Sequence, residues 1–350
     1  MSLPGFKLLR PRTVDEAVEH LEKHGGNVRV LAGGTDLIPS MRQKLFEPEY
    51  VLDVRGIADL RGIRMGNAKA PLLAKAAKNG APAVEPGSEV IIGALTSLRE
   101  IERSNYLQEH FPVLTEAAAT VASPVIRNMG TIGGNICLDT RCLWYNQSLA
   151  WRKGCGFCIK KDGDLCHVAP GGSKCWAVFS GDTPPALLCL NAEIEIVGPA
   201  GARRVALGEF YALDGINYRK LAANELVTRI FLPAESAGYR GVYRKLRVRG
   251  SIDYPLAGVA VAMKRSSNGH GVGDVADARV AITAVNPAPL LVAEAGEILS
   301  GRKFDEELAE IVGDMAARTA KPLTTSALTP EYRREMIRVF TKRAVLAAAN

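Results

Sequence analysis

A short apolar segment that runs into two glycines and then into a helix is the strongest constraint on how this chain can fold. The segment, residues 28–31, predicts a buried strand, and the turn after it reads Ala-Gly-Gly-Thr-Asp over residues 32–36. Backbone N–H groups are free in such a turn, and glycine lets a phosphate approach the backbone closely. With a helical stretch at 37–44 behind it, the turn indicates a phosphate site, although most glycine pairs after strands are only turns.

A second glycine pair repeats this arrangement further along the chain. It reads Thr-Ile-Gly-Gly-Asn over residues 131–135, so that a hydroxyl and an amide flank the permissive backbone. Neither loop has the glycine spacing of a Rossmann fingerprint or of a P-loop. We therefore expect any dinucleotide to be held by two separate loops.

The segments around these loops predict alternating helices and strands. A capping box of Thr13 and Glu16 opens a helix over 13–24, and glycines at 25 and 26 stop it. Further on we expect a strand at 50–54, an exposed loop at 67–88, a strand at 90–92 and helices at 98–103 and 112–122. Later strands at 193–197, 226–231, 241–248, 259–263 and 279–285 are spaced like an antiparallel sheet, and helices at 305–318 and 330–348, the latter capped by Thr329, close the chain.

Composition narrows the class of protein. With 350 residues, 47% of them hydrophobic, the chain is long enough for two or three domains, and it has neither a membrane-length apolar run nor the apolar core of a signal peptide. We expect a soluble cytoplasmic protein. The net charge of +7 is most concentrated in the last helix, which we expect to be solvated or to face a partner; the positions are Arg333, Arg334, Arg338, Lys342 and Arg343. Only 6% of residues are aromatic and no base-stacking motif is visible, which argues against nucleic-acid binding.

All seven cysteines lie between Cys137 and Cys189, which points to a metal rather than to disulfides. Four thiolates can bind zinc or an all-cysteine [4Fe-4S] cluster. Only Cys155 and Cys158 form a CxxC pair, whereas zinc ribbons use two such pairs, so the spacing favours the cluster. From spacing alone, either of these two could be a ligand. Cys137 and Cys189 stand in apolar, strand-like contexts and are expected in the core.

Two sequence segments carry a specific family resemblance. Residues 30–37 (VLAGGTDL) and 130–135 (GTIGGN) resemble the FAD-contacting segments of the flavoprotein subunit in the xanthine dehydrogenase and carbon monoxide dehydrogenase family, and residues 91–96, 181–186, 243–247 and 256–260 also have counterparts there. The resemblance implies an α+β fold. Residues 1–235 would form a two-subdomain FAD-binding domain of the PCMH/VAO type, and residues 236–350 a C-terminal antiparallel sheet with helices, like that of the carbon monoxide dehydrogenase flavoprotein.

The same resemblance implies the FAD-binding residues. The first segment would hold the pyrophosphate through Val30, Leu31, Ala32, Gly33, Gly34, Thr35, Asp36 and Leu37. The second would hold the phosphate and ribityl region through Thr131, Gly134 and Asn135, and Asp182 and Lys245 would contact the rest of the flavin. No general base or nucleophile is expected in this chain.

Residues 138–180 form an insertion that this family usually lacks. It resembles the insertion in the β subunit of 4-hydroxybenzoyl-CoA reductase at residues 139–142 (DTRC), 145–148 (YNQS) and 166–168 (CHV). By that resemblance a [4Fe-4S] cluster would be held by Cys142, Cys158, Cys166 and Cys175, without Cys155. His167 is expected near the cluster or at the surface and not as a ligand.

The resemblance implies an electron relay rather than a site of substrate chemistry. The chain would belong to a heterotrimer, dimerised as a whole, with a molybdenum cofactor in the large subunit and two [2Fe-2S] clusters in the small one. In the 4-hydroxybenzoyl-CoA reductase type, a ferredoxin-like donor supplies electrons through the [4Fe-4S] cluster and FAD. Two alternatives remain: an FAD subunit of an oxidative hydroxylase acting on aldehydes, purines or carbon monoxide, and a zinc-stabilised nucleotide-binding module.

Overall fold

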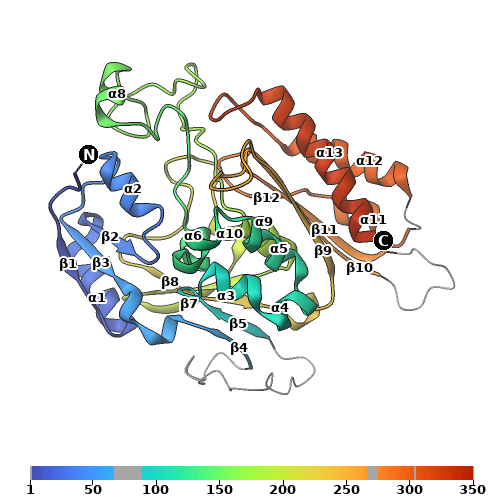
Figure 1. The fold of residues 1–350 in the computed structure, drawn as a ribbon, viewed down its shortest axis with the longest axis horizontal. Coiled ribbons are helices and arrows are strands. Elements are labelled where there is room, and N and C mark those ends of the chain that lie inside the picture. The colour runs from blue at the N-terminus through green and yellow to red at the C-terminus, as the bar shows by residue number, and fades with distance from the viewer. Residues whose placement is uncertain (1, 67–88, 266–274, 303–304, 350) are drawn as a thin grey trace.

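Three β-sheets with helices between and around them form the chain (Figure 1). The structure is a computed structural model, and it describes residues 2–66, 89–265, 275–302 and 305–349. The loop expected at 67–88 lies outside these residues.

The first sheet is parallel and has three strands. Its order is β1 (Lys7–Leu9), β3 (Tyr50–Asp53) and β2 (Val28–Leu31). Helix α1 (Val14–His24) begins where the Thr13 hydroxyl accepts a hydrogen bond from the Glu16 N–H at 3.1 Å, and it ends at Gly25, whose φ of +52° suits glycine. Ala17 and Leu21 of this helix are buried against the sheet, as the apolar spacing predicts. Strand β2 then leads into the first glycine loop and α2 (Leu37–Arg42).

The second sheet is antiparallel and has five strands. Its order is β4 (Ile63–Met65), β5 (Val90–Gly93), β8 (Leu226–Leu232), β6 (Glu193–Gly198) and β7 (Gly201–Ala206). Seven short helices accompany it: α3 (Leu98–Arg103), α4 (Asn105–His110), α5 (Pro112–Thr120), α6 (Pro124–Met129), α7 (Ile132–Ile136), α9 (Thr183–Cys189) and α10 (Leu207–Phe210). Buried side chains of the sheet and of most of these helices form one core, which includes Ile132 and Ile136 on either side of the second glycine pair in α7.

The third sheet is also antiparallel, with the order β12 (Leu290–Leu291), β11 (Val275–Thr283), β10 (Ala257–Arg265) and β9 (Arg240–Leu246). Successive residues of β10 face opposite ways. Ala260 and Ala262 pack into the core of the second sheet, while Val259 and Val261 pack into a separate core under α11 (Ala295–Leu299), α12 (Glu306–Thr319) and α13 (Pro330–Ala349). The strands expected in one antiparallel series therefore divide, because β8 pairs with β5 and β6 and not with β9.

The basic last helix is not solvated throughout, so that expectation is wrong at one residue. The Thr329 hydroxyl caps α13 as predicted, by accepting from the Tyr332 N–H at 3.2 Å. The Arg333 side chain, however, is completely buried, and its guanidinium donates to the carbonyl oxygens of Leu256, Leu323 and Ala284 at 2.6–2.8 Å. Burial lowers the pKa of Arg333 to about 10.

The insertion leaves the body of the protein through a narrow neck. Arg141 and Val178 exchange two backbone hydrogen bonds of 2.8 Å, so the chain enters and leaves the insertion at the same place. Figure 1 shows the insertion, with α8 (Leu149–Gly154), standing beside α2 and away from the sheets. The Arg152 guanidinium links the insertion to the end of α2 by donating to the carbonyl oxygens of Gln43 and Lys44 at 3.2 and 2.9 Å.

Along the described ranges, no helix combines the length and the apolar character needed to cross a membrane.

Candidate functional site

Both glycine loops line one large cavity, with a volume of about 880 Å³. Most of the predicted FAD-binding residues lie on its wall; these are Val30, Ala32, Gly33, Gly34, Thr35, Asp36, Leu37, Thr131, Gly134, Asn135 and Asp182. Leu31 and Lys245 do not line it. The structure thus brings together residues from β2 and the loop after it, from the first turn of α7 and its cap, and from the cap of α9, which are distant in the sequence.

The first loop presents free hydrogen-bond donors to this cavity. Gly34 has a φ of +74°, which turns the chain sharply into α2, and the Ile38 N–H donates to the Gly34 carbonyl. Within the described residues, the N–H groups of Gly33, Gly34, Thr35 and Asp36 donate to no protein acceptor. Such a run of unpaired amides is suited to an anion.

The two loops touch each other at Gly33. A Cβ atom on this residue would lie 2.1 Å from the Met129 carbonyl oxygen and 3.0 Å from the Gly130 Cα. Only glycine allows so close an approach. The sequence predicts that a ligand approaches the backbone closely at Gly33. In the structure, the absence of a side chain on Gly33 also makes room for the second loop.

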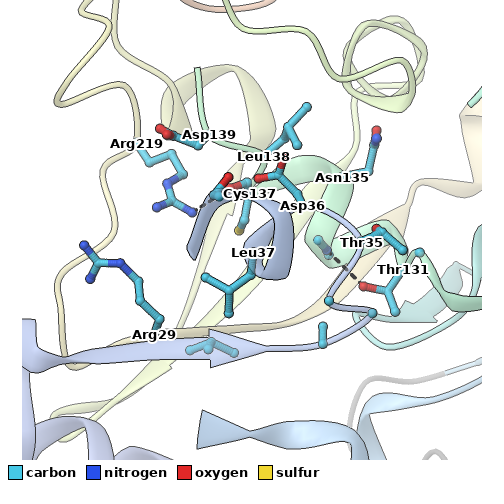
Figure 2. A pocket seen from close by; sticks show the side chains of 18 of the residues that line it. Arg29, Thr35, Asp36, Leu37, Thr131, Asn135, Cys137, Leu138, Asp139 and Arg219 are labelled. Carbon is cyan, nitrogen blue, oxygen red and sulfur yellow. Dashed lines mark hydrogen bonds between the residues drawn. The ribbon is translucent and has the colours of Figure 1, made fainter. Parts of the chain in front are cut away.

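The second loop offers side chains rather than backbone donors. The Thr131 hydroxyl accepts from the Gly134 N–H at 3.1 Å, and the Gly133 N–H donates to the Ala94 carbonyl at 2.9 Å. The Asn135 side-chain oxygen accepts from the N–H and the hydroxyl of Thr183 at 3.0 and 2.7 Å. Figure 2 shows Thr131 and Asn135 close to Thr35 and Asp36 of the first loop.

Asp182 and Lys245 form a buried ion pair behind the cavity. The Lys245 Nζ lies 3.0 Å from one carboxylate oxygen of Asp182, and the Tyr243 hydroxyl donates to the other at 2.8 Å. The side chains of the pair are only 2% and 3% exposed. Burial raises the pKa of Asp182, while the charge of Lys245 opposes this rise. Asp182 thus lines the cavity directly, whereas the charge of Lys245 affects the cavity through its ion pair with Asp182.

Two cavity residues that the sequence did not indicate converge on Asp36. Arg141 lies 3.1 Å and the Tyr254 hydroxyl 3.0 Å from the same carboxylate oxygen, and the Arg141 guanidinium lies 3.9 Å from the Tyr254 ring centre. Burial raises the pKa of Asp36, and the charge of Arg141 opposes it. Asp36 and Arg141 stand in segments that carry the family resemblance, but the three residues are far apart in the chain, so no local sequence signal could have shown that they meet.

The four cysteines predicted as ligands are all buried, whereas Cys155 is half-buried. Cys142, Cys158 and Cys175 belong to one small core of the insertion. Burial raises the pKa of the Cys142 thiol to about 12 and of the Cys175 thiol to about 11. In the part of the chain that the structure describes, no three His, Cys, Asp or Glu side chains converge to hold a metal ion, so the predicted metal centre is not supported there.

The sequence predicts strand-like surroundings for the remaining two cysteines, Cys137 and Cys189. In the structure, both stand at the ends of helices instead. Cys189 closes α9 and is completely buried, as a core residue should be. Cys137 follows α7, is half-buried and lines the cavity, where its carbonyl oxygen accepts from Arg219 at 2.8 Å (Figure 2).

Comparison with known families identifies this architecture. Residues 4–78 and 82–235 match the family described as "FAD binding domain in molybdopterin dehydrogenase". The chain belongs to this family of FAD-binding subunits. Residues 241–348 match a second family, the "CO dehydrogenase flavoprotein C-terminal domain".

Several proteins are similar to the chain over nearly its full length. It is 32% identical to the carbon monoxide dehydrogenase medium chain of Afipia carboxidovorans, over 98% of this chain and 96% of that protein. It is 28% identical to the glyceraldehyde dehydrogenase medium chain of Sulfolobus acidocaldarius, over 97% of each. Among solved structures, a Cu,Mo-CO dehydrogenase in its cyanide-inactivated form superimposes with a TM-score of 0.77 at 30% identity, over 99% of both chains.

These comparisons confirm the predicted α+β fold, with a flavin-binding part followed by a sheet covered by helices. They confirm an FAD-binding oxidoreductase subunit of the molybdenum hydroxylase family. They do not show the narrower likeness to 4-hydroxybenzoyl-CoA reductase, nor a [4Fe-4S] cluster.

Proposed function

We propose that this chain carries FAD in the 880 Å³ cavity and transfers electrons for an oxidative molybdenum hydroxylase. The observation that carries the proposal is the row of unpaired amides from Gly33 to Asp36, which lines the same cavity as Thr131 and Asn135. The amides would bind the pyrophosphate, and the hydroxyl and amide side chains of the second loop would bind the phosphate and ribityl region. FAD supplies the redox chemistry when it is bound.

The chain's own charged residues would orient the cofactor. Arg141 and Tyr254 hold Asp36, and the positive charge of Arg141 offsets the repulsion between this carboxylate and a pyrophosphate. Asp182, held by Lys245 and Tyr243, would accept hydrogen bonds from the flavin side of the molecule. Nothing in this arrangement requires a proton-transferring side chain.

The remaining components of the enzyme are proposed from the named relatives. These are medium chains or FAD subunits of enzymes such as carbon monoxide dehydrogenase, glyceraldehyde dehydrogenase and nicotine 6-hydroxylase. We propose a large subunit with the molybdenum cofactor and a small subunit with two [2Fe-2S] clusters, assembled as a dimer of heterotrimers. The substrate, an aldehyde, carbon monoxide or an N-heterocycle, would bind in the large subunit.

The cysteine insertion favours a second candidate, an enzyme of the 4-hydroxybenzoyl-CoA reductase type. Four buried thiols in one small unit are the full ligand set of a [4Fe-4S] cluster. In this candidate Cys142, Cys158, Cys166 and Cys175 bind the cluster, and a ferredoxin-like donor delivers electrons to it. A protein with zinc at these cysteines is the third candidate, and it is the weakest because zinc ribbons use two CxxC pairs and only Cys155 and Cys158 form one here.

Cofactor analysis of the full chain purified without oxygen tests these alternatives. The primary proposal expects one FAD per chain, and a chain that releases no FAD on denaturation would refute it. Four irons and acid-labile sulfide per chain would favour the reductase type, whereas one zinc without sulfide would favour the third candidate.

Cysteine variants test the ligand assignment. We expect Cys142→Ala to lose iron and keep FAD, because the insertion is joined to the body at a narrow neck. Cys155→Ala is the matched control and should keep both, since its thiol is not among the buried four. Iron retained in Cys142→Ala would contradict the assignment.

A further inference from the structure

A second recess, with a volume of about 620 Å³, opens between strand β9, helix α13 and the end of α5. β9 is the outer strand of the third sheet, so side chains from both of its faces can reach this edge. In the described part of the chain, every charged residue that lines the recess is a lysine or an arginine. We call it the basic recess. The larger cavity differs from it, because carboxylates such as Asp36 and Asp182 also line that cavity.

Alternation along β9 places its cations on two faces of the strand. Arg244 shares one face with Val242 and Leu246, which pack against the core under α13. Lys245 and Arg247 lie on the opposite face, and the Lys245 Nζ donates to the carbonyl oxygen of the last residue of α5 at 2.9 Å. Cations from both faces therefore meet in the basic recess.

Helix α13 supplies the other wall. Phe340, Arg343 and Ala347 follow one another at intervals of three and four residues, so they lie on one face of the helix, and all three line the basic recess. Phe340 is half-buried, whereas Arg343 is exposed. Leu346 lines the recess as well. The helix thus places an apolar wall next to a positive charge.

The arginines of the basic recess lack counter-ions in the described structure. Arg244, Arg247 and Arg343 are exposed, and none of them forms a hydrogen bond or an ion pair with a described residue. Lys342, next to Arg343 on α13, instead pairs with two glutamates of α12. Like charges that gather without a counter-ion repel one another, and a bound anion removes this repulsion.

The ion pair of Asp182 and Lys245 connects the basic recess with the larger cavity. Lys245 and Tyr243 line the recess, and both donate to Asp182, which lines the cavity. Burial raises the pKa of Asp182, and the charges of Lys245 and Arg247 oppose this rise. The charge of the basic recess therefore acts on a residue of the cavity wall.

We propose that the basic recess binds a phosphorylated small molecule of nucleotide size, with its phosphates on Arg244, Arg247 and Arg343 and its ring against Phe340. A planar guanidinium donates to two phosphate oxygens at once. The volume is in the range of small-molecule sites, about 300–1,000 Å³, and Phe340 offers a planar ring an apolar surface. Neither FAD nor electron transfer is needed for this binding, which therefore goes beyond the proposed function.

Titration calorimetry of the FAD-loaded full chain with ADP tests the proposal. FAD fills the larger cavity, so that the glycine loops do not compete for the phosphates of the probe. Pyrophosphate and adenosine are the two partial probes. We expect ADP to bind more tightly than pyrophosphate, and adenosine alone not to bind measurably. The affinity for ADP should fall as the NaCl concentration rises, because the arginines are exposed and salt screens their charge.

Variants assign the binding to the recess. Arg244→Gln and Arg343→Gln should each weaken ADP binding at least tenfold, because each removes hydrogen bonds from a charged donor. Phe340→Leu should weaken the binding of ADP and leave that of pyrophosphate unchanged. Arg240→Gln is the matched control, since Arg240 is an exposed arginine on the same strand but outside the recess. It should bind ADP as the wild type does.

A wild-type chain that does not bind ADP, or an equal loss of affinity in Arg240→Gln, would overturn the proposal. ADP binding that releases FAD would also overturn it, because the nucleotide would then occupy the larger cavity. Binding of polyglutamate without binding of ADP would assign the basic recess to an acidic protein partner instead. If the chain takes up no FAD, the proposed function fails on its own, and the arginine variants of the FAD-free chain still decide where ADP binds.

Discussion

Replacing Gly33 by alanine should lower FAD affinity more than the addition of a single methyl group suggests. The new Cβ would meet the Met129 carbonyl oxygen at 2.1 Å and the carbonyl carbon at 2.8 Å. Ordinary contacts of this kind lie at about 3.5 Å, so the two glycine loops must separate by roughly 1 Å. Both contacted atoms are backbone atoms, and no side chain can rotate away to relieve the clash.

The expected magnitude follows from this separation. Overpacking of a well-packed site costs about 1–3 kcal/mol, and for a unit of this size each kcal/mol lowers Tm by roughly 2–4 °C. The separation also moves the free amides of the first loop away from Thr131 and Asn135. Since about 1.4 kcal/mol corresponds to a tenfold change in Kd, we expect FAD affinity to fall at least tenfold.

The assay combines thermal unfolding followed by circular dichroism with FAD titration followed by quenching of flavin fluorescence. Gly5→Ala is the control, because a Cβ on this exposed residue has no atom within 4 Å. It should leave both Tm and Kd unchanged. If Gly33→Ala binds FAD as tightly as the wild type and unfolds at the same temperature, the loop-to-loop contact does not constrain the site.

Two further predictions concern buried charges. Asp182→Asn or Lys245→Met alone should lower the free energy of unfolding by about 3–5 kcal/mol, because each leaves a buried charge without its partner. In urea unfolding, the double variant should lose clearly less stability than the sum of the two single variants. Strictly additive losses would show that the pair is not coupled. Arg333→Met should lower the free energy of unfolding by about 3 kcal/mol, because it leaves buried carbonyl oxygens without a donor. Arg334→Met is the control at the next position, which is partly exposed, and it should change the free energy of unfolding by less than about 0.5 kcal/mol. Equal effects at the two positions would contradict this reasoning.

Local signals predicted local structure well. The Thr13 cap and the glycines after His24 define α1, although the predicted capping box is only half formed because the Glu16 carboxylate accepts from the Arg12 N–H and not from that of Thr13. The apolar run of β2 between these glycines and the next pair has the predicted bounds. Each of these features depends on contacts within a few residues. The placement of a strand in one sheet or another does not, which is why β6 and β8 could not be distinguished from β9, β10 and β11 by their spacing.

The site divides in the same way. The two glycine loops are visible in the sequence because glycine pairs with polar neighbours mark turns beside apolar segments. The contacts of Asp36 with Arg141 and Tyr254 join segments far apart in the chain, and only the fold brings them together. Arg333 was misjudged for a related reason, since a basic helix gives no sign of which single residue meets unpaired carbonyl groups in the interior.

The neck at Arg141 and Val178 bears on how such a chain can acquire a new redox centre. The two strands of the neck are held by a pair of backbone hydrogen bonds, so a shorter connection could join these residues without disturbing either glycine loop. The cysteine-bearing segment is thus attached to the flavin-binding part at the neck and, through Arg152, at the end of α2. A chain in which a short turn replaces residues 142–177 would lose Tyr145 and Lys160 from the cavity wall and the Arg152 contact with α2, so we expect it to bind FAD less tightly.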